Sequence, residues 1–358
     1  MYRVIATALI LRVVLAIPAA AQVPPGYEIV TIDPDPTFNY TAKMNNHGQI
    51  VYSVWLDGGN TDAIDIFLYD NGEITRLTDD DVYDRGPDIN DAGQIVWCRA
   101  VDGPGTPIQI VMWQDGELTQ LTFSNLDDLR PRINNLGHVV WKRWEGEGCQ
   151  NYSADIYFYD GQTIHQITND DWSNQGAFIN DDDWITWTRY DFCQHPWDSQ
   201  IMLWRDEFIT QISPEDTFEA QSKSINNRGQ VSWSYASGYG QDGIQIWEDG
   251  ETTTLTEDGG GGYLNDKGHV VFWRWYDDGG PVGAYEVWLY RNGQFLQITD
   301  DPHDQGWNNF WNLPKDINNL GEIVYDHGRP WYDESIIKWM RLRLGTAGAA
   351  AKSEAINP

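Results

Sequence analysis

The sequence is poor in cysteine and in positive charge. Only three cysteines occur in 358 residues, which excludes a scaffold held together by many disulfides. Lys and Arg number 23 against 54 Asp and Glu, for a formal net charge of -31. Nucleic acid and anionic membrane surfaces are therefore excluded as partners, because both require clustered cations. An acidic, solvated surface is the expected consequence.

Catalytic and metal-binding signatures are also missing. The chain contains no G-x-S-x-G, H-E-x-x-H, P-loop or dinucleotide motif, which favours a protein without catalytic activity. Acidic pairs recur as "LTDDD", "ITNDD" and "ITDD", and calcium prefers oxygen ligands of this kind, but no stretch fits a complete calcium loop. His195, His303 and His327 match no zinc spacing. We expect no metal and no cofactor, with calcium as the weaker alternative.

Long apolar runs are confined to the first residues. "MYRVIATALILRVVLAIPAAAQ" combines the basic Arg3, an apolar run and a small-residue site before Gln22, which is typical of a secretory signal peptide over residues 1–21. Arg12 interrupts the run, and the clean stretch from Val13 is short for a membrane span of about 20 residues. We expect export to the periplasm or the extracellular space, without membrane insertion after signal cleavage. An uncleaved anchor is the alternative.

The chain does contain a repeat of about 45 residues. Its mark is an apolar residue and Asn before a tight turn, at Met44, Ile89, Ile133, Ile179, Ile225, Leu264 and Ile317. Each unit holds four short runs rich in β-branched and aromatic residues, and none shows a helical period. The pattern predicts an all-β fold, a seven-bladed β-propeller with four antiparallel strands per blade, over residues 22–343. A disordered tail is expected over residues 344–358.

Two further patterns concern closure and packing. The last unit lacks a fourth strand, and Tyr27–Asp33 matches the fourth-strand pattern, so we expect the N-terminal strand to complete the last blade. An aromatic residue stands four positions after the turn glycine, or its equivalent Asp183, in every unit. We expect these aromatics to pack between blades, with a ligand platform as the alternative: Tyr52, Trp97, Trp141, Trp187, Trp233, Phe272 and Tyr325.

Two stretches, "DIFLYDNGEITRLT" from Asp65 and "DIYFYDGQTIHQIT" from Asp155, resemble the TolB-type propeller repeat. In that family a Ser-Pro-Asp-Gly turn precedes an aliphatic strand, an Ile-Tyr strand and a terminal Leu-Thr. The resemblance extends over residues 27–340 and implies the propeller fold, whose members bind proteins or sugars and occasionally act as lyases or hydrolases. This chain departs from the family in having Ile-Asn where the family has Trp-Ser-Pro-Asp.

The strand order gives the disc two unlike faces. The short Asn-Gly turns fall on one face, and the longer links between strands two and three and between blades fall on the other, which we call the loop face. Function is expected there because loops on a rigid scaffold usually carry it. Aromatic residues of these links could stack on sugars or anchor a protein, or else cap the blade ends: Trp144, Trp197, Trp275, Trp307, Trp311, Trp331 and Tyr332.

Four units also place an arginine near the loop face, six positions after the turn glycine or its equivalent. A partial ring of guanidinium groups would suit carboxylate or sulfate ligands. The alternative, favoured by the many nearby acids, is that each arginine stacks on Trp and pairs with an Asp of a neighbouring blade. These ligand-binding candidates are Arg99, Arg143, Arg189 and Arg274.

The cysteines divide into two kinds. Cys149 and Cys193 lie in comparable loops of adjacent units and form a candidate disulfide, whereas Cys98 lies in a strand and is expected to be a buried free thiol.

These patterns favour an exported, non-catalytic propeller that binds a protein or glycan ligand through its loop face. One alternative is a propeller lyase or hydrolase acting on acidic polysaccharide, with the arginines neutralising the substrate and a loop His or Tyr as base. A purely structural role in an envelope or matrix is a third.

Overall fold

The computed structural model describes residues 23–32, 39–55, 64–103, 105–146, 153–191, 195–215, 220–236, 242–276, 284–300, 311–329 and 334–342. Every helix or strand element within these ranges is a β-strand. The described residues accordingly include no helix of the length and apolarity that a membrane crossing requires.

Three sheets consist of four consecutive antiparallel strands each. The first contains β2 (Asn39–Met44), β3 (Ile50–Trp55), β4 (Ile64–Asp70) and β5 (Glu73–Arg76). The second contains β6 (Asp84–Ile89), β7 (Ile95–Arg99), β8 (Gln109–Gln114) and β9 (Glu117–Gln120). The third contains β18 (Gln221–Ile225), β19 (Val231–Ala236), β20 (Asp242–Glu248) and β21 (Glu251–Thr256).

One larger sheet has eight strands. Its first half is β10 (Asp127–Ile133), β11 (Val139–Trp144), β12 (Ala154–Tyr159) and β13 (Ile164–Gln166). Its second half is β14 (Ser173–Ile179), β15 (Ile185–Asp191), β16 (His195–Arg205) and β17 (Phe208–Gln211). A single parallel pair, Ala154 with Ser173, joins the halves.

The other eight-stranded sheet contains both ends of the described chain. One half is β22 (Gly260–Leu264), β23 (Val270–Tyr276), β24 (Ala284–Arg291) and β25 (Gln294–Gln297). The other is β26 (Trp311–Ile317), β27 (Ile323–Arg329), β28 (Glu334–Leu342) and β1 (Tyr27–Thr31). Tyr285 pairs with Trp311 between the halves.

The N-terminal strand closes the sheet that ends the chain, as the sequence predicts. β1 pairs antiparallel with β28, from Tyr27 opposite Leu342 to Thr31 opposite Lys338. The Tyr27 hydroxyl also donates a hydrogen bond of 2.6 Å to the backbone oxygen of Leu320. Residues about 300 positions apart in sequence are thereby held side by side, and the outer edge of β28 is covered.

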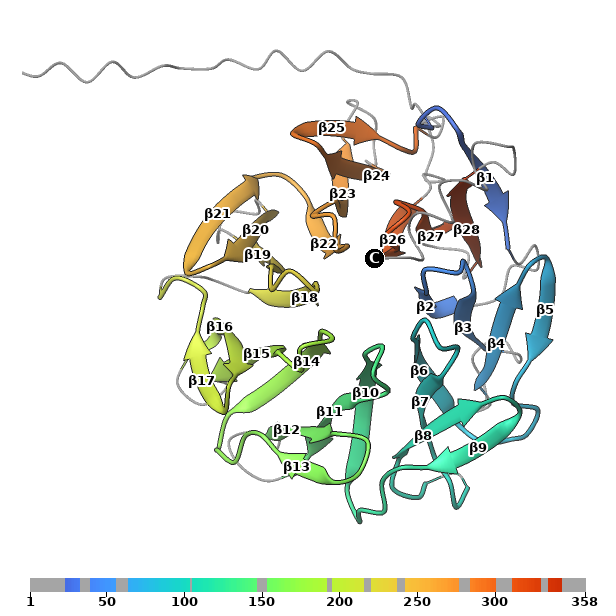
Figure 1. Ribbon diagram of the computed structural model, residues 1–358, viewed down its shortest axis with the longest axis vertical. Coiled ribbons are helices and arrows are strands. Elements are labelled where there is room, and N and C mark those ends of the chain that lie inside the picture. Colours follow the sequence, from blue (N-terminus) through green and yellow to red (C-terminus); the bar gives the residue numbers. More distant parts are fainter. Residues whose placement is uncertain are drawn as a thin grey trace, which may run out of the picture.

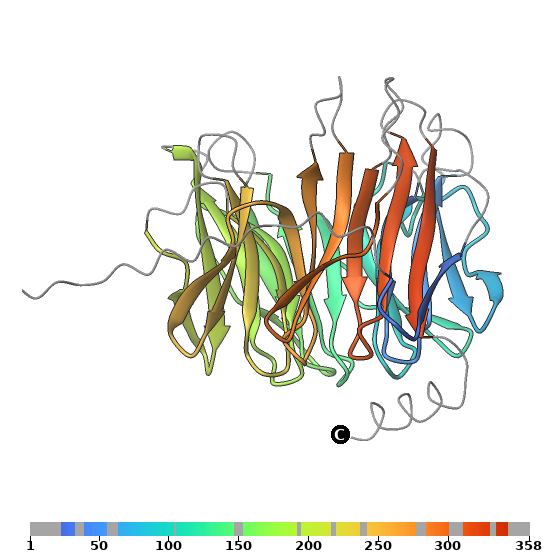
Figure 2. The same ribbon diagram turned by 90° about the horizontal axis from the view of Figure 1, so that it is seen from above.

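The sheets stand radially around a common centre, as in a β-propeller (Figure 1). Cavities lined by the inner strands lie there, and we call this central space the channel. The first strand of each group, such as β2, β6 and β10, lies nearest the centre. Viewed from the side, the short turns gather at one end of the channel (Figure 2). This agrees with the short-turn face that the strand order predicts, whereas most of the longer connections lie outside the described residues.

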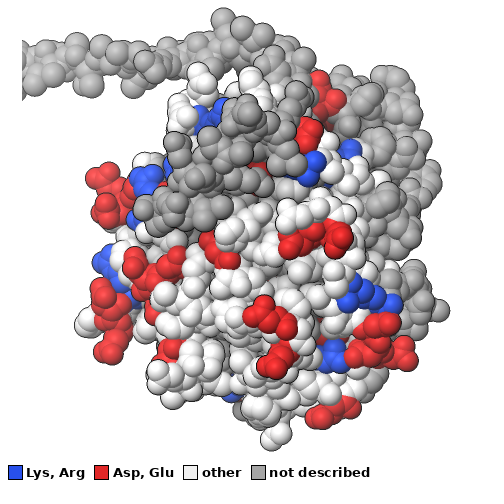
Figure 3. Space-filling model, turned by 45° about the vertical axis from the view of Figure 1, so that its right-hand side comes forward, with Lys and Arg blue, Asp and Glu red and all other residues white. Residues whose placement is uncertain are grey.

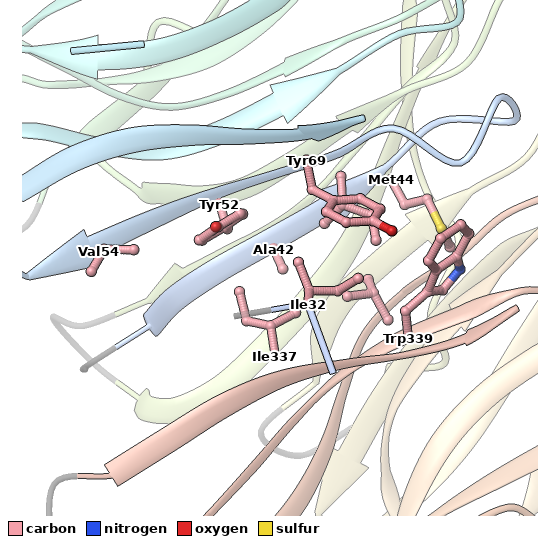
Figure 4. Packing of buried hydrophobic residues seen from close by; sticks show 10 residues of the cluster. Ile32, Ala42, Met44, Tyr52, Val54, Tyr69, Ile337 and Trp339 are labelled. Carbon is pink, nitrogen blue, oxygen red and sulfur yellow. The ribbon is translucent and has the colours of Figure 1, made fainter. Parts of the chain in front are cut away.

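Apolar side chains fill the space between neighbouring sheets. Figure 4 shows one such cluster, where Tyr52 and Tyr69 of the first sheet meet Ile337 and Trp339 of β28. All seven aromatics that follow the repeated turns are at most 1% exposed. They pack in the core, so the interpretation as packing residues is confirmed, and the ligand platform is excluded.

The repeated asparagine forms a belt around the short-turn end of the channel. Asn226 shows the pattern: its Oδ1 accepts the backbone N–H groups of Arg228 and Gln230, and its Nδ2 donates to the backbone oxygen of Asn265 at 2.9 Å. Each amide thus shapes its own turn and also bonds the next unit. The relay returns to its start through Asn45, Asn90, Asn134, Asn180, Asn226, Asn265 and Asn318.

A second belt follows the first, one residue further along each turn. The backbone N–H of Asn46 donates to Asp91 Oδ1 at 2.8 Å, and that of Asp91 donates to Asn135 Oδ1 at 2.9 Å. The cycle continues to Asn319, whose N–H donates to Asn46 Oδ1 at 2.7 Å. The Ile-Asn-Asx pattern is therefore the bond between units as well as a turn signal.

Buried carboxyl groups couple the fold to pH. Desolvation raises the pKa of Asp84 to about 6 and also raises the pKa of Asp65 and Asp155. The folded protein therefore holds these protons more tightly than the unfolded chain does. The contribution of Asp84 to stability is complete below about pH 4 and is lost as the pH rises through about 6, and the contributions of Asp65 and Asp155 change in the same direction.

We therefore expect the free energy of unfolding to fall between about pH 4 and pH 7. Urea unfolding at a series of pH values would measure it, and Asp84→Asn should flatten part of the fall. Hydrogen bonds lower the pKa of Asp160, so this residue changes the free energy of unfolding only at lower pH. A free energy of unfolding that rises over the same interval would contradict the assignment.

Candidate functional site

The channel wall is shaped by bulges in the inner strands. In β10 the pairing with β11 shifts register between Leu129 and Arg132, and Arg130 between them has φ 57°. The corresponding bulges of β6 and β14 place Gly86 and Gly176 at positive φ. Arg130 therefore has a backbone conformation that glycine adopts at the equivalent positions of β6 and β14. The bulge also changes the direction of its side chain.

Cations gather along these inner strands, although acidic side chains dominate visible parts of the outer surface (Figure 3). Two of the cations are compensated: Lys43 lies 3.6 Å from Asp316, and Lys315 lies 2.6 Å from Asp326. Five other described cations of this region, four on the inner strands and Lys142 on the adjoining β11, form no ion pair within 4.0 Å. These are Arg85, Arg130, Arg132, Lys142 and Lys223.

Mutual repulsion adds to desolvation within this group. Burial, followed by the positive charges of Arg130 and Arg85, lowers the pKa of Lys142 to about 8. Burial and the charges of Arg132 and Arg85 likewise lower the pKa of Arg130. The buried carboxylate of Asp88 interacts with Arg132 and Lys43 and compensates only part of the positive charge inside the wall. The remaining excess favours an anion.

The positive charges of the channel wall also affect Tyr263, which lies on the opposite side of the channel. Burial alone would raise the pKa of its hydroxyl, but Lys223, Lys43, Lys315 and Arg132 together lower it below the ordinary value. Lys43 Nζ also lies 4.8 Å from the centre of the Tyr263 ring. The positive potential thus extends across the channel.

Two adjoining cavities open among these side chains. One, of about 390 Å³, is lined by Arg130, Arg132, Thr188 and Tyr190 among others. The second, of about 340 Å³, extends toward β19, β23 and β26. Both are lined by Gln221, Lys223 and Tyr263, so together they form one polar chamber in the channel, which we call the channel chamber.

The φ of Arg130 makes a separate prediction. An L side chain at this φ costs about 1–2 kcal/mol relative to glycine, so Arg130→Gly should raise the free energy of unfolding by about 1 kcal/mol. Arg132→Gly is the matched control: the same change two residues away, without positive φ, should destabilise the protein. Urea unfolding measures both. Destabilisation by Arg130→Gly would show that its side chain contributes more than its strain costs.

Two of the arginines predicted from the sequence are held within their own sheets. Arg99 pairs with Asp84, and Arg143 pairs with Asp128 at 2.7 Å. The same carboxylates accept hydrogen bonds from the buried indoles of Trp97 and Trp141.

The other two arginines pack mainly on aromatic rings. Arg189 lies 4.7 Å from the ring of Trp172 and donates to Gln200. Arg274 lies 4.6 Å from Trp288 and donates to Thr256 Oγ1 at 3.1 Å. None of the four lines the channel chamber, and their binding of a ligand remains a prediction.

The aromatic candidates fall into two sets. Trp144, Trp275 and Trp311 are described and are 42%, 43% and 37% exposed. Trp275 and Trp311 both contact Tyr285, and Trp275 and Tyr285 line a loop-face cavity of about 450 Å³. Outside the described residues, or with side chains that are not described, lie Trp197, Trp307, Trp331 and Tyr332.

The described residues include one cysteine and one cluster of carboxylates. Cys98 is a buried free thiol, as predicted, whereas Cys149 and Cys193 lie outside the described residues. Within the described ranges, three carboxylates lie close enough together to hold a metal ion: Asp65, Asp80 and Asp84. Arginine guanidinium groups already contact all three, so we assign no metal to them.

Comparison with known proteins supports the fold. No protein-family model matches the chain, and no curated protein matches it. Among solved structures, the β-propeller domain of the Trilobed protease from Pyrococcus furiosus aligns with a TM-score of 0.59 at 9% identity, over 85% of this chain and 96% of that one. The chain is a β-propeller. The Pyrococcus domain is described as having an open velcro topology, whereas here β1 pairs with β28.

Two peptidases show the same likeness. Acylaminoacyl peptidase from Pyrococcus horikoshii gives a TM-score of 0.61 at 12% identity, over 88% of this chain and 54% of that one. A puromycin-hydrolyzing peptidase from Mycobacterium tuberculosis gives 0.53 at 12% identity, over 84% and 48%. This chain therefore spans about half the length of these enzymes. The expectation of a non-catalytic propeller that binds a protein or glycan through its loop face is corrected, because these three solved propellers belong to peptidases.

The channel cations were missed at the sequence level. Sequence reasoning gave weight to the loops and treated each strand before "IN" as scaffold. A signal was present, because a cation stands within four residues before that pair in five of the repeats: Lys43, Arg85, Arg130 with Arg132, Lys223 and Lys315.

Proposed function

We propose that this chain serves a serine peptidase as its β-propeller, either joined to the catalytic domain or bound to it. The observation that carries the proposal is the alignment with acylaminoacyl peptidase, in which 88% of this chain matches about half of the enzyme. The loop face would meet the catalytic domain. The exposed rings of Trp144, Trp275 and Trp311 are suited to such a contact, because aromatic residues often carry the binding energy of an interface.

We further propose that the propeller has seven blades. Each eight-stranded sheet divides at its single parallel pair into two groups of four strands. The asparagine belt supports the same count, since each of its members belongs to a different group. A TolB-type origin of the repeat remains a proposal that rests on the sequence resemblance.

Export of the chain is also a proposal. The signal-like segment, residues 1–21, lies outside the described residues. Expression of the full sequence in a bacterial host should yield a secreted form that begins at Gln22. N-terminal sequencing of the protein from the periplasm or medium tests this, and a cytoplasmic product that retains Met1 would contradict it.

If the chain associates with a serine peptidase, purification of the chain should recover peptidase activity with it. The tagged chain, cross-linked in its source cells, should recover a protein that a fluorophosphonate probe labels, because such probes react with active serine hydrolases. The recovered fraction should cleave N-acylated peptides, and loss of both signals after pretreatment with the probe would link them.

A matched variant defines the surface. Replacing Trp144, Trp275 and Trp311 by alanine removes exposed rings on the loop face and should reduce capture at least tenfold. Replacing Leu118 and Phe208, which are exposed on β9 and β17, should leave capture unchanged. If the wild-type chain recovers no probe-labelled protein and no peptide cleavage, the proposed function is wrong.

A further inference from the structure

We propose that the channel chamber binds the carboxylate groups of an acidic peptide segment, with Arg130, Arg132 and Lys223 as its principal ligands. The anion site follows from the charges in the chamber. The choice of a peptide rests on the proposed function.

The cations of the chamber differ from most other cations of the molecule, which have carboxylate partners. The chain carries a net charge of -31, so a cation at a random position would have acidic neighbours. Arg76, Arg99, Arg143, Arg228 and Arg341 are indeed all paired with carboxylates. Arg189, Lys267 and Arg291 also form no ion pair among the described residues, but the other five unpaired cations, Arg85, Arg130, Arg132, Lys142 and Lys223, lie together along the channel wall. Such an arrangement costs free energy unless an anion compensates it.

One of these charges, Arg130, lies in a strained backbone conformation. Arg130 has φ 57° at a position where three other repeats have glycine at positive φ, namely Gly86, Gly176 and Gly261. Burial and the neighbouring charges of Arg132 and Arg85 also lower its pKa. Both effects destabilise the empty chamber, and strain held at a concave site commonly serves binding.

A further argument concerns hydrogen bonding. Arg132 Nε is buried and donates to no group among the described residues. Its Nη1 donates to the backbone oxygen of Pro131, and its guanidinium group stacks on Phe178 at 5.3 Å. Gln175 and Gln221 add side-chain amides to the same wall. An oxyanion in the chamber would satisfy the unused donor, as arginine–carboxylate pairs do.

The size of the chamber favours a chain over a single small ion. Its two parts of about 390 and 340 Å³ share Lys223 and Tyr263, and cavities of this size hold drug-sized ligands. Arg130 and Arg132 line only the first part, whereas Lys315 lines only the second. Two carboxylates on one extended peptide could therefore be bound at the same time.

Fluorescence anisotropy with a labelled hexaglutamate peptide tests the proposal on the full chain. Hexaglutamate should bind, hexaglutamine should not, and affinity should fall at least tenfold between 50 and 500 mM NaCl, because ion pairing is screened. Lys223→Glu should lower the affinity at least tenfold. Lys267→Glu is the matched control: it makes the same charge change on an exposed turn at the opposite end of the channel and should leave the affinity unchanged.

Arg130→Gly gives a second variant that is expected to fold at least as stably as the wild type. It should lose affinity tenfold or more while its unfolding midpoint rises or holds. A lower affinity explained by unfolding is thereby separated from the loss of a ligand group.

Proton uptake supplies a readout that nonspecific binding would not give. Burial, with repulsion from Arg130 and Arg85 added to it, lowers the pKa of Lys142 to about 8. An anion beside Arg130 offsets the repulsion and raises this pKa, so binding at pH 8 should take up part of a proton. Calorimetry in two buffers of different ionisation enthalpy measures it. Lys142→Met should abolish the uptake, and uptake that persists in this variant would place the anion elsewhere. The neighbouring thiol of Cys98, whose pKa is raised by burial, remains protonated at this pH.

The outcomes separate the two proposals. Equal affinity for hexaglutamate and hexaglutamine, or an equal effect of Lys223→Glu and Lys267→Glu, would overturn the anion site. Tighter binding of an oligogalacturonate than of hexaglutamate would overturn the choice of a peptide. Hexaglutamate binding without capture of a peptidase would leave the chamber assignment intact and remove the proposed function.

Discussion

Replacing Asn226 by leucine should lower the free energy of unfolding by about 3–4 kcal/mol. The amide is 3% exposed and takes part in four hydrogen bonds, two within its turn through Oδ1 and two through Nδ2, to Gln230 and to the backbone oxygen of Asn265. Leucine removes all four and leaves buried backbone groups without partners, at about 1 kcal/mol or more each. Urea unfolding followed by tryptophan fluorescence measures the change.

Two variants test this effect. Asn226→Asp keeps the acceptor oxygen but places a carboxylate oxygen against the acceptor oxygens of Gln230 and Asn265, so its loss should equal or exceed that of Asn226→Leu. Asn125→Ala, at an exposed position, should change the free energy of unfolding by less than about 0.5 kcal/mol. If Asn226→Leu unfolds at the wild-type urea concentration, the belt adds nothing to the stability of the ring.

Removal of the N-terminal strand should have a still larger effect. A variant without residues 23–32 loses the side chains of Tyr27 and Ile32, which are 8% and 4% exposed, and the full β1–β28 pairing. Burial of two such side chains contributes about 3–6 kcal/mol, and the backbone hydrogen bonds add to it. We expect a loss of at least about 5 kcal/mol, measured by urea unfolding.

The exposed edge of β28 gives this variant a second signature. An unpaired strand edge recruits other strands, so light scattering should detect dimers or larger species. Tyr27→Phe keeps the ring and the strand pairing but removes the hydroxyl, which donates to the backbone oxygen of Leu320. It should cost about 1 kcal/mol without self-association. A variant that lacks residues 344–358 serves as a truncation control. An unchanged unfolding midpoint and a monomeric state after loss of residues 23–32 would show that β1 is dispensable.

The fold could be predicted from the sequence because its signals are local and repeated. Turn glycines, alternating strands and a period of about 45 residues identify the units, and the missing fourth strand after Ile317 identifies β1 as its replacement. The aromatics after each turn are buried as expected, because a large ring between twisted sheets has nowhere else to pack.

The asparagine relay could not be predicted in the same way. The pattern shows that Asn shapes its own turn, since the acceptors and donors are near in sequence. It does not show that Nδ2 reaches a carbonyl about 45 residues away, as from Asn90 to Asn134. That contact depends on how the units are stacked.

The chamber was missed for a related reason. Which strand residues face the channel depends on bulges such as that between Leu129 and Arg132, and a register shift reverses the expected alternation. The loop arginines were given weight instead, and the structure places Arg99 and Arg143 in internal ion pairs. The functional expectation was wrong at a further step, because no residue pattern in the chain pointed to a peptidase.

The asparagine belt lies at one end of the channel, away from the loop face on which function is expected. The hydrogen bonds of the belt lie at the short-turn end (Figure 2), away from the longer connections that the sequence predicts on the loop face. A connection can therefore lengthen, shorten or acquire new chemistry without disturbing the groups that hold the circle together. Such a molecule can evolve new specificities by insertion at one end while its assembly stays constant at the other.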